Sequence, residues 1–223
     1  MTTAEGPVTP QGPALLLVLC HPAQGSLCAA LARAVADGAR GAGVAVTVHD
    51  LYRDGFDPRL AAAEVESTRF ADDLAARYAR DLLAADAVAV VHPVWFFGPP
   101  AALKGWVERV VREGVAYDVG EDGAVTGRLR ARAALVVTTG NAGRATEASL
   151  GDTVTRFWRD LVFGPAGVPE TRRLAFAPVR GSAAEERAAW IEAARREAAT
   201  LAAAVRAYLG SHRAEQRRPD EPT

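Results

Sequence analysis

The sequence predicts one α/β domain built on an open, doubly wound parallel sheet of five strands, in the order 2-1-3-4-5 and with helices on both faces. The length of 223 residues suits a single domain, and 49% hydrophobic residues can bury a sizeable core. Apolar strand patterns alternate with helical patterns along the chain, as is typical of a covered parallel sheet. Unusual loops follow the first, third and fourth expected strands, where such sheets bind ligands.

The first half of the chain contains three expected strands. The run Leu15–Cys20 is continuously apolar, as in a strand buried on both faces, and a helix is expected after it over Leu27–Gly38. The more alternating run Val44–Val48 predicts the second strand, and a helical pattern covers Asp72–Leu83. The apolar run Ala87–His92 predicts the third strand.

The second half repeats this alternation. After the third strand a helix is expected over Ala101–Val111, with its apolar residues spaced to face the core and with Lys104 and Arg109 on its surface. The fourth strand is expected over Ala133–Thr138 and the fifth over Leu174–Ala177. The two remaining helices are expected over Thr153–Phe163, where Trp158 and Phe163 fit either the core or an interface, and Ala184–Leu209.

The two ends of the chain differ from this pattern. Met1–Gly12 is rich in Thr, Pro and Gly, and Ser211–Thr223 contains Arg217-Arg218-Pro219 and an acidic end. Both segments predict disordered tails, so the folded domain is expected to cover residues 13–210.

The composition argues against several classes of protein, among them nucleic-acid-binding and membrane proteins. The formal net charge is −1, with basic and acidic residues scattered, which gives no electrostatic footprint for nucleic acid or an anionic membrane. The apolar runs are far shorter than the roughly 20 residues of a membrane helix, and no signal peptide is recognisable. Cys20 and Cys28 are expected as buried, reduced thiols without a metal site or disulfide framework. We therefore expect a cytoplasmic protein without membrane insertion.

The loop after the third strand, Pro93–Pro100, is the most informative segment. It contains three consecutive aromatic residues, Trp95, Phe96 and Phe97, between prolines and a glycine. Loops are normally solvated, and each ring left in water forfeits roughly 1.5–3 kcal/mol. A planar ligand or another subunit is therefore expected to cover the rings, with backbone N–H groups from Val94 to Phe97 pointing at the polar edge of such a ligand.

The loops after the first and fourth strands add polar groups. His21–Ser26 opens directly into a helix, whose N-terminus suits a phosphate, and Ser26 can cap the helix and bind an anionic oxygen. Thr138–Gly143 supplies two hydroxyls, an amide and backbone donors that can hold negative charge on a ring. Each loop alone is a weak signal, since Ser26 also fits an ordinary N-cap and Thr138–Gly143 an ordinary turn. Together they describe a flavin nucleotide.

These residues resemble the flavodoxin-like NAD(P)H:quinone oxidoreductase family, which includes mammalian quinone reductases and many bacterial relatives. The block from Trp95 to Arg109 is the specific part of the resemblance. The matching pieces keep their order from Leu15 to about Phe176: His21 with Ser26, Asp50-Leu51-Tyr52, Phe56-Asp57-Pro58, Ala84-Ala85-Asp86, Pro93 to Val110, Ala116-Tyr117 and Thr138-Thr139-Gly140.

The resemblance implies a flavodoxin-like fold, FAD (less often FMN) and a homodimer with active sites at the subunit interface. It also implies a ping-pong reaction in which NAD(P)H reduces the flavin and a quinone or similar acceptor then takes two electrons. The implied phosphate contacts are His21, Ser26, Leu27 and Cys28. The implied ring contacts are Pro93, Val94, Trp95, Phe96 and Phe97 on one side and Thr138, Thr139, Gly140 and Asn141 on the other.

Three further residues follow from the same resemblance. Tyr117 would reach into the acceptor pocket, usually that of the partner subunit, and Arg187 would lie near the adenosine. The mammalian enzymes carry a Tyr and a His after the fourth-strand loop, whereas this chain offers Arg144, Thr146 and Asp152. Arg144 is either a cation opposite the charge of the reduced ring or a solvated loop residue. The segment from Leu150 to Trp158 instead resembles a bacterial branch of the family.

Other functions remain open. An FMN-dependent azo or nitro reductase is close in chemistry, and a flavin-binding regulatory subunit of a potassium-efflux system has the same fold. An electron-carrier flavodoxin is disfavoured, because such proteins have a hydroxyl-rich phosphate loop and an acidic composition. This chain has only Ser26 in that loop and a net charge of −1.

Overall fold

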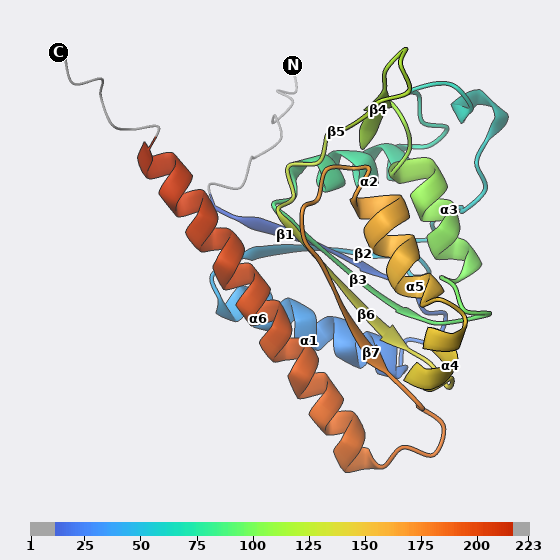
Figure 1. Ribbon diagram of the computed structural model, residues 1–223, viewed down its shortest axis with the longest axis vertical. Coiled ribbons are helices and arrows are strands. Elements are labelled where there is room, and N and C mark those ends of the chain that lie inside the picture. The colour runs from blue at the N-terminus through green and yellow to red at the C-terminus, as the bar shows by residue number, and fades with distance from the viewer. Residues whose placement is uncertain (1–11, 216–223) are drawn as a thin grey trace, which may run out of the picture.

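A five-stranded parallel sheet forms the centre of the chain in a computed structural model that describes residues 12–215 (Figure 1). The strand order is β2-β1-β3-β6-β7, so the predicted 2-1-3-4-5 topology is confirmed. The bounds are β1 (Ala14–Leu19), β2 (Ala45–Asp50), β3 (Ala87–Pro93), β6 (Ala133–Thr139) and β7 (Thr171–Phe176).

Helices cover both faces of this sheet (Figure 1). Successive strand residues point to opposite faces, so Leu16 and Val18 of β1 enter one core while Leu15 and Leu17 enter the other. The first core lies against α2 (Asp73–Ala84), α3 (Ala101–Val110), α5 (Thr153–Arg156) and the π-helix η2 (Phe157–Phe163). The second core lies against α1 (Leu27–Gly41) and α6 (Ala184–Glu215).

Four short elements were not expected. They are the 3₁₀-helix η1 (Ala62–Glu64), the hairpin strands β4 (Tyr117–Val119) and β5 (Val125–Gly127), and α4 (Arg144–Ser149). Each is six residues or shorter, too short to display a helical or strand period clearly. The expected helix over Thr153–Phe163 is present, but its second part is wound as a π-helix. In it the Gly164 N–H donates to Arg159 O at 2.9 Å.

The closing helix is longer than expected. The prediction ended it at Leu209 and assigned Ser211–Thr223 to a tail, whereas α6 continues to Glu215. No proline interrupts residues 211–215, and the Ser211 hydroxyl donates to the Tyr208 carbonyl at 2.8 Å. The other residues assigned to tails, 1–11 and 216–223, lie outside the described part of the chain.

The expectation that Arg109 lies on the surface of α3 is wrong. Its side chain is 1% exposed and donates to both carboxylate oxygens of Glu64, at 3.0 and 2.8 Å. It also donates to Asp72 Oδ2 and to the Asp57 carbonyl, each at 2.6 Å. The helical spacing places Arg109 correctly on α3, but the segment between β2 and α2 folds over that position and supplies the carboxylates.

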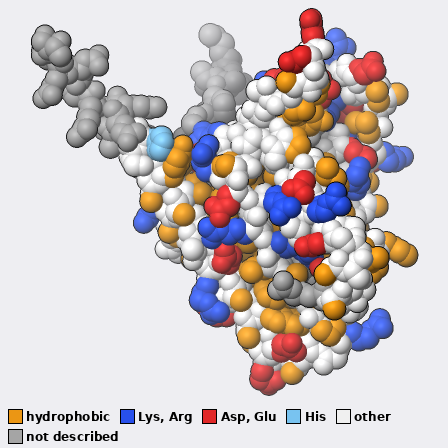
Figure 2. Space-filling model, in the orientation of Figure 1, with side chains coloured by type: hydrophobic (Ala, Val, Ile, Leu, Met, Phe, Trp, Pro, Cys, Tyr) orange, Lys and Arg blue, Asp and Glu red, His pale blue; other side chains and the backbone are white. Residues whose placement is uncertain are grey.

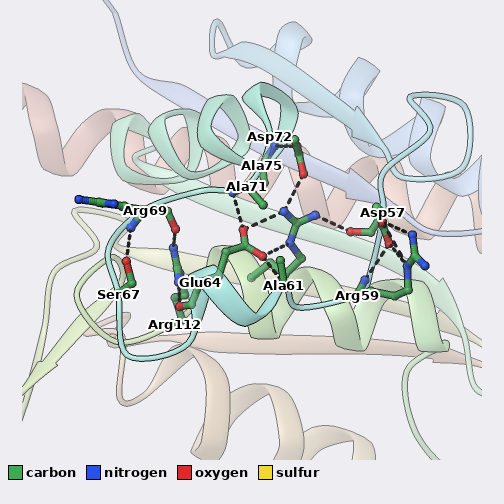
Figure 3. A network of polar contacts seen from close by, with 11 residues as sticks. Asp57, Arg59, Ala61, Glu64, Ser67, Arg69, Ala71, Asp72, Ala75 and Arg112 are labelled. Atoms are coloured by element: carbon green, nitrogen blue, oxygen red, sulfur yellow. Dashed lines mark hydrogen bonds and ion pairs between the residues drawn. The ribbon is translucent and has the colours of Figure 1, made fainter.

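Burial and hydrogen bonding have opposite effects on the pKa of Glu64 in this network. Burial disfavours the charge on Glu64, but hydrogen bonds from Arg109 and from the backbone N–H groups of Ala61 and Ala71 outweigh it and lower the pKa of Glu64 to about 2. Both members of the buried pair therefore stay charged, and together they hold η1 against α3 (Figure 3).

The surface shows no extended area of one charge on the face drawn in Figure 2, where basic and acidic side chains are interspersed. Among residues 12–215, no helix combines the length and the apolar character needed to span a bilayer.

Candidate functional site

Three loops meet at the carboxyl ends of the strands. They are the first loop (His21–Ser26) after β1, the second loop (Pro93–Pro100) after β3 and the third loop (Thr138–Gly143), which begins in the last residues of β6. The Val94 N–H donates to Thr139 O at 2.7 Å, which joins the second and third loops. The rings of His21 and Trp95 lie 6.3 Å apart between centroids, so the first loop also contacts the second. The predicted convergence of the loops is therefore present.

The second loop contains a strained turn, which we call the aromatic turn (Trp95–Gly98). Trp95 and Gly98 exchange two backbone hydrogen bonds, of 3.1 and 3.0 Å. Phe96 and Phe97 between them have φ angles of 49° and 57°, a left-handed conformation usual for Asn-Gly and costly for bulky residues. Phe96 is 105% exposed and Trp95 44%. The turn therefore holds aromatic rings in solvent at a conformational cost of about 1–2 kcal/mol per residue.

The free donors of the aromatic turn are fewer than expected. Backbone N–H groups from Val94 to Phe97 were predicted to face a ligand, but those of Val94 and Trp95 already bond Thr139 O and Gly98 O. The backbone N–H groups of Phe96 and Phe97 have no hydrogen-bond partner among the described residues. These two adjacent donors remain available for a polar ring edge.

The first loop is shaped by its own histidine. The Ala23 N–H donates to His21 Nδ1 at 3.0 Å, and Ser26 caps α1 by accepting from the Ala29 N–H at 3.2 Å. Within the described residues, the N–H groups of Leu27 and Cys28 have no acceptor, and the first turn of α1 contains no acidic residue. Since the Ser26 hydroxyl hydrogen is also free, this end of α1 keeps the donors that an anionic group requires.

Both cysteines are buried and unbonded to each other, as expected. Burial raises the pKa of the Cys28 thiol to about 11, although a hydrogen bond with Thr139 opposes the shift, and burial raises that of Cys20 to about 12. Cys28 Sγ lies 3.2 Å from Thr139 Oγ1 and thereby joins α1 to the third loop. The Cys28 side chain thus serves packing, and only its backbone N–H faces outward as a donor.

The third loop offers a different set of groups from the one predicted. The Thr139 hydroxyl is paired with Cys28, and the Thr138 hydroxyl accepts from Arg173 Nε and Nη2 at 3.2 and 3.1 Å. Both hydroxyls are therefore used inside the chain. The Asn141 side-chain oxygen accepts from the Arg180 N–H at 2.8 Å, and the amide NH₂ of Asn141 has no hydrogen-bond partner among the described residues.

The backbone of the third loop is braced from β7. The Gly140 N–H donates to Phe176 O at 3.0 Å, and its carbonyl accepts from the Val179 N–H at 2.8 Å. A Cβ on Gly140 would have the side chain of Val94 as its nearest neighbour, at 3.7 Å. Gly140 thus lies directly beside the start of the second loop, and a flat group can approach its backbone.

Arg173 of β7 is a site residue that sequence reasoning missed. Its side chain is 8% exposed, and its guanidinium bonds Thr138, Glu147 of α4 and Asp152 at the start of α5. The signal available in the sequence was a pair of arginines directly before the apolar residues Leu174–Phe176. That pair gives no indication of which arginine faces the interior.

The structure does not bring every predicted site residue to the loops. Tyr117 begins β4, whereas the second loop precedes α3, and the ten residues of that helix, about 15 Å in length, lie between them in the chain. Arg187 lies in the first turn of α6 and donates to Ser182 Oγ at 3.1 Å. Arg144 is the first residue of α4, and its side chain lies outside what the structure describes.

One cavity, of about 80 Å³, lies against the third loop and is lined by Val94, Gly140, Glu147 and Phe176, among others. A second, of about 320 Å³, shares Glu147 and Phe176 and extends to Asp152 and Arg173. A larger cavity of about 520 Å³ lies elsewhere, beside Tyr117 and the segment 64–68. Within residues 12–215, no group of three or more His, Cys, Asp or Glu side chains is arranged to hold a metal ion.

Comparison with known proteins places this geometry in context. The family described as "Flavodoxin-like fold" matches residues 13–202. The chain is 34% identical over 115 residues to the Escherichia coli protein named uncharacterized NAD(P)H oxidoreductase YcaK, a match that covers 49% of this chain and 58% of that protein. It is 30% identical over 151 residues to human ribosyldihydronicotinamide dehydrogenase [quinone], covering 58% of this chain and 64% of the human protein.

Among solved structures, the chain is similar to an NAD(P)H:quinone oxidoreductase from Methanothermobacter marburgensis. The TM-score is 0.75 at 24% identity, and the match covers 85% of this chain and 99% of that one. This likeness concerns the fold. The chain spans less than two thirds of the length of the two curated relatives named above.

Proposed function

The chain belongs to the family with the flavodoxin-like fold, and from this premise we propose that it is a flavin-dependent NAD(P)H oxidoreductase that reduces a quinone or a similar small electrophilic acceptor. The observation that carries the proposal is the meeting of three strand-end loops, of which the second contains the two free N–H groups of the aromatic turn. The relatives' names supply the reaction class, since they specify an NAD(P)H oxidoreductase and a ribosyldihydronicotinamide dehydrogenase [quinone].

The described residues fit a flavin nucleotide. The free N–H groups at the start of α1, with Ser26 and His21, would hold the phosphate portion. Trp95, Phe96 and Phe97 would hold the ring system, and the exposure of Trp95 and Phe96 is explained if a flat apolar group covers them. Gly140 and Asn141 would lie at the other edge. We propose FAD, with Arg187 near its adenosine, and FMN is the alternative.

The chain's own residues would bind and orient rather than react. A bound flavin supplies two-electron chemistry, taking a hydride from NAD(P)H and passing two electrons to the acceptor in a second half-reaction. The N–H groups of Phe96 and Phe97 and the Asn141 amide are preorganised donors, and such donors stabilise negative charge that develops on a bound ring. Cys20 and Cys28 take no part, because their raised pKa values keep both thiols protonated at neutral pH.

We also propose a homodimer with its active sites at the subunit interface. Tyr117 is separated from the aromatic turn of its own chain by the length of α3, so it would act in the acceptor pocket of the partner subunit. This arrangement would also cover the exposed rings of the second loop. Arg144, at the start of α4, remains a candidate cation beside the third loop.

The first test is flavin binding. We expect the purified protein to be yellow or to quench the fluorescence of added FAD or FMN, and Trp95→Ala to raise the Kd about tenfold, because the ring loses a stacking surface. Tyr208→Ala is the matched control, since Tyr208 is 36% exposed but lies near the end of α6. A wild-type protein that binds neither flavin would contradict the proposal.

The second test identifies the acceptor. Flavin-loaded protein is mixed with NADH or NADPH and with a quinone, an azo dye or a nitroaromatic compound in separate assays. We expect the quinone to give the highest kcat/KM. Preference for the azo dye or the nitroaromatic compound would reassign the acceptor and leave the flavin assignment intact.

A further inference from the structure

One helix makes hydrogen bonds to the second loop and to the residue that precedes it. The helix runs through α5 and η2, from Thr153 to Phe163. Thr153 bonds the loop itself, whereas Trp158, five residues later, bonds His92, the residue before the loop. Thr153 Oγ1 donates to the Phe97 carbonyl at 2.6 Å. Trp158 Nε1 donates to His92 Nε2 at 2.9 Å, and His92 Nδ1 donates to the Pro93 carbonyl at 2.8 Å.

The contact at Pro93 is deeply buried. His92 and Trp158 are both 0% exposed, so their hydrogen bonds have no competition from water. The two partners fix the tautomer of His92, because Nε2 must accept while Nδ1 donates. Burial lowers the pKa of His92 to about 4, which keeps the ring neutral and its Nε2 acceptor available. The start of the second loop is therefore fixed from inside the core.

The hydrogen bond between Thr153 and the Phe97 carbonyl lies at the surface and holds the strained part of the loop. The Phe97 carbonyl belongs to the same peptide plane as the Gly98 N–H, which closes the aromatic turn onto Trp95 O at 3.0 Å. By accepting from Thr153, this carbonyl fixes the orientation of that plane. The left-handed φ of 57° at Phe97 is thus supported by a contact from outside the loop.

The N-terminal end of the helix is itself anchored. Asp152 caps α5 by accepting from the Thr155 N–H at 3.3 Å, and its Oδ1 also accepts from Arg173 Nη1 at 2.9 Å. Arg173 bonds Thr138 of the third loop through the same guanidinium. The position of Thr153 is therefore tied to β7 and to the third loop.

Core packing does not require the Thr153 hydroxyl. The buried surface of this helix is provided by Val154, Trp158, Val162 and Phe163, whereas Thr153 is exposed. Its hydroxyl bonds the aromatic turn, a segment 56 positions away in the sequence. A purely structural helix would gain little from this contact.

We infer that Thr153 is a positioning residue for the aromatic turn: its hydrogen bond to the Phe97 carbonyl keeps the free N–H groups of Phe96 and Phe97 in the orientation that binds the flavin ring. This inference rests on the proposed function. It assigns a role to the segment after the third loop, where the chain departs from the Tyr and His of the mammalian enzymes.

The test compares Thr153→Val, which keeps the shape but removes the hydroxyl, with Thr153→Ser, which keeps the hydroxyl. Thr200→Val on α6 is the control, because the Thr200 hydroxyl bonds only its own helix, at Arg196 O. In flavin-free protein, Thr153→Val is expected to speed hydrogen exchange of the Trp95 and Gly98 amides about fivefold, because the turn opens more often. Thr153→Ser and Thr200→Val should leave those rates within about twofold.

The same variants are titrated with FAD and FMN. Thr153→Val is expected to raise the flavin Kd about three- to tenfold, the range expected for one lost hydrogen bond, with recovery in Thr153→Ser. A Tm unchanged from wild type would separate this effect from unfolding, and Thr153→Ala gives a second hydroxyl-free variant.

Unchanged amide exchange and unchanged Kd in both hydroxyl-free variants would overturn the inference. Wild-type protein that binds no flavin would overturn the proposed function, whereas the exchange rates would still decide whether Thr153 holds the turn.

Discussion

His92 shows how the chemistry of a single residue here depends on its surroundings. The side chain is fully buried between Trp158 and the Pro93 carbonyl, and burial lowers its pKa to about 4. The edge-strand residue His49 is also buried, and burial lowers its pKa although a hydrogen bond with Asp81 opposes the shift. Both rings are therefore neutral at physiological pH and act through fixed hydrogen bonds.

We expect the free energy of unfolding to fall as the pH is lowered from about 6.5 to about 4. In this range the unfolded chain protonates His92 at its ordinary pKa while the folded chain does not, so protons favour unfolding. Above pH 6.5 the stabilisation is fully present. At about 1.4 kcal/mol per pKa unit, the loss due to His92 reaches at most about 3.5 kcal/mol. Urea unfolding at several pH values between 7.5 and 4.5 measures this decrease in the free energy of unfolding.

Other groups also titrate as the pH is lowered. His49, whose pKa burial also lowers, contributes to the loss in the same direction as His92. Glu64 has a folded pKa of about 2, so its stabilisation is lost mainly below pH 4.5 and outside this range. An NMR titration of the His92 ring identifies the residue directly. A His92 signal that titrates near pH 6.5 in the folded protein would contradict the expectation.

At the scale of elements, the close contact between α1 and α6 depends on one glycine, Gly38, which has no side chain. A Cβ on Gly38 of α1 would lie 2.2 Å from the backbone oxygen of Arg195 on α6. Gly38 therefore permits the two helices to approach at backbone distance, and the second core closes around them. Gly41, in the same helix, has nothing within 4 Å of its Cβ position.

Gly38→Ala is expected to lower the free energy of unfolding by about 1–3 kcal/mol, because the added methyl group must push two backbones apart. Gly41→Ala is the matched control in the same helix and is expected to stabilise by up to about 1 kcal/mol, through better helix propensity and reduced chain entropy. Urea midpoints of the two variants and the wild type provide the comparison. Equal midpoints for the two variants would show that the helices can separate without cost.

At the scale of the molecule, α3 separates two parts of the proposed site. The aromatic turn precedes its N-terminus, and Tyr117 follows its C-terminus beside the 520 Å³ cavity. The ten residues of this helix span about 15 Å. We propose that the two parts act on one ligand from different subunits.

This geometry predicts complementation between subunits. We expect the 23.5 kDa chain to form a dimer in light scattering, and Trp95→Ala and Tyr117→Ala each to lower quinone reduction. When the two variants are mixed under conditions that exchange subunits, sites with both native residues form, and activity should recover to about a quarter of wild type. Each variant taken alone through the same exchange is the control. A monomer, or a mixture no more active than its components, would contradict the shared site.

Several features of the fold and the site could be predicted from local patterns. The continuous apolar run before His21 and the one before Pro93 required strands buried on both faces, and the alternation with helices required parallel pairing. From this the position of the loops followed, because the carboxyl ends of parallel strands share one edge. The three aromatic residues of the second loop could also be predicted as part of a site. Loops are usually solvated, so three apolar rings in one loop indicate that something covers them.

The partners of individual side chains could not be predicted in this way. Arg109 has the spacing of a surface residue on its helix, and Thr138 and Thr139 have the composition of a ligand-binding loop. Each is bonded inside the chain by a residue from a distant segment. Periodicity reports which side of an element a residue occupies, but not which segment covers that side.

The sequence by itself determined the strands, the helices between them and the edge at which the loops meet, because these depend on the hydrophobic pattern within each element and on the parallel pairing that the alternation requires. Only the tertiary structure decided that Arg109 pairs with Glu64, that Trp158 holds His92 and that Thr153 holds the aromatic turn. These contacts join residues 45, 66 and 56 positions apart, respectively. Hydrogen bonds of this kind depend on how the completed elements pack, and no pattern within one element carries that information.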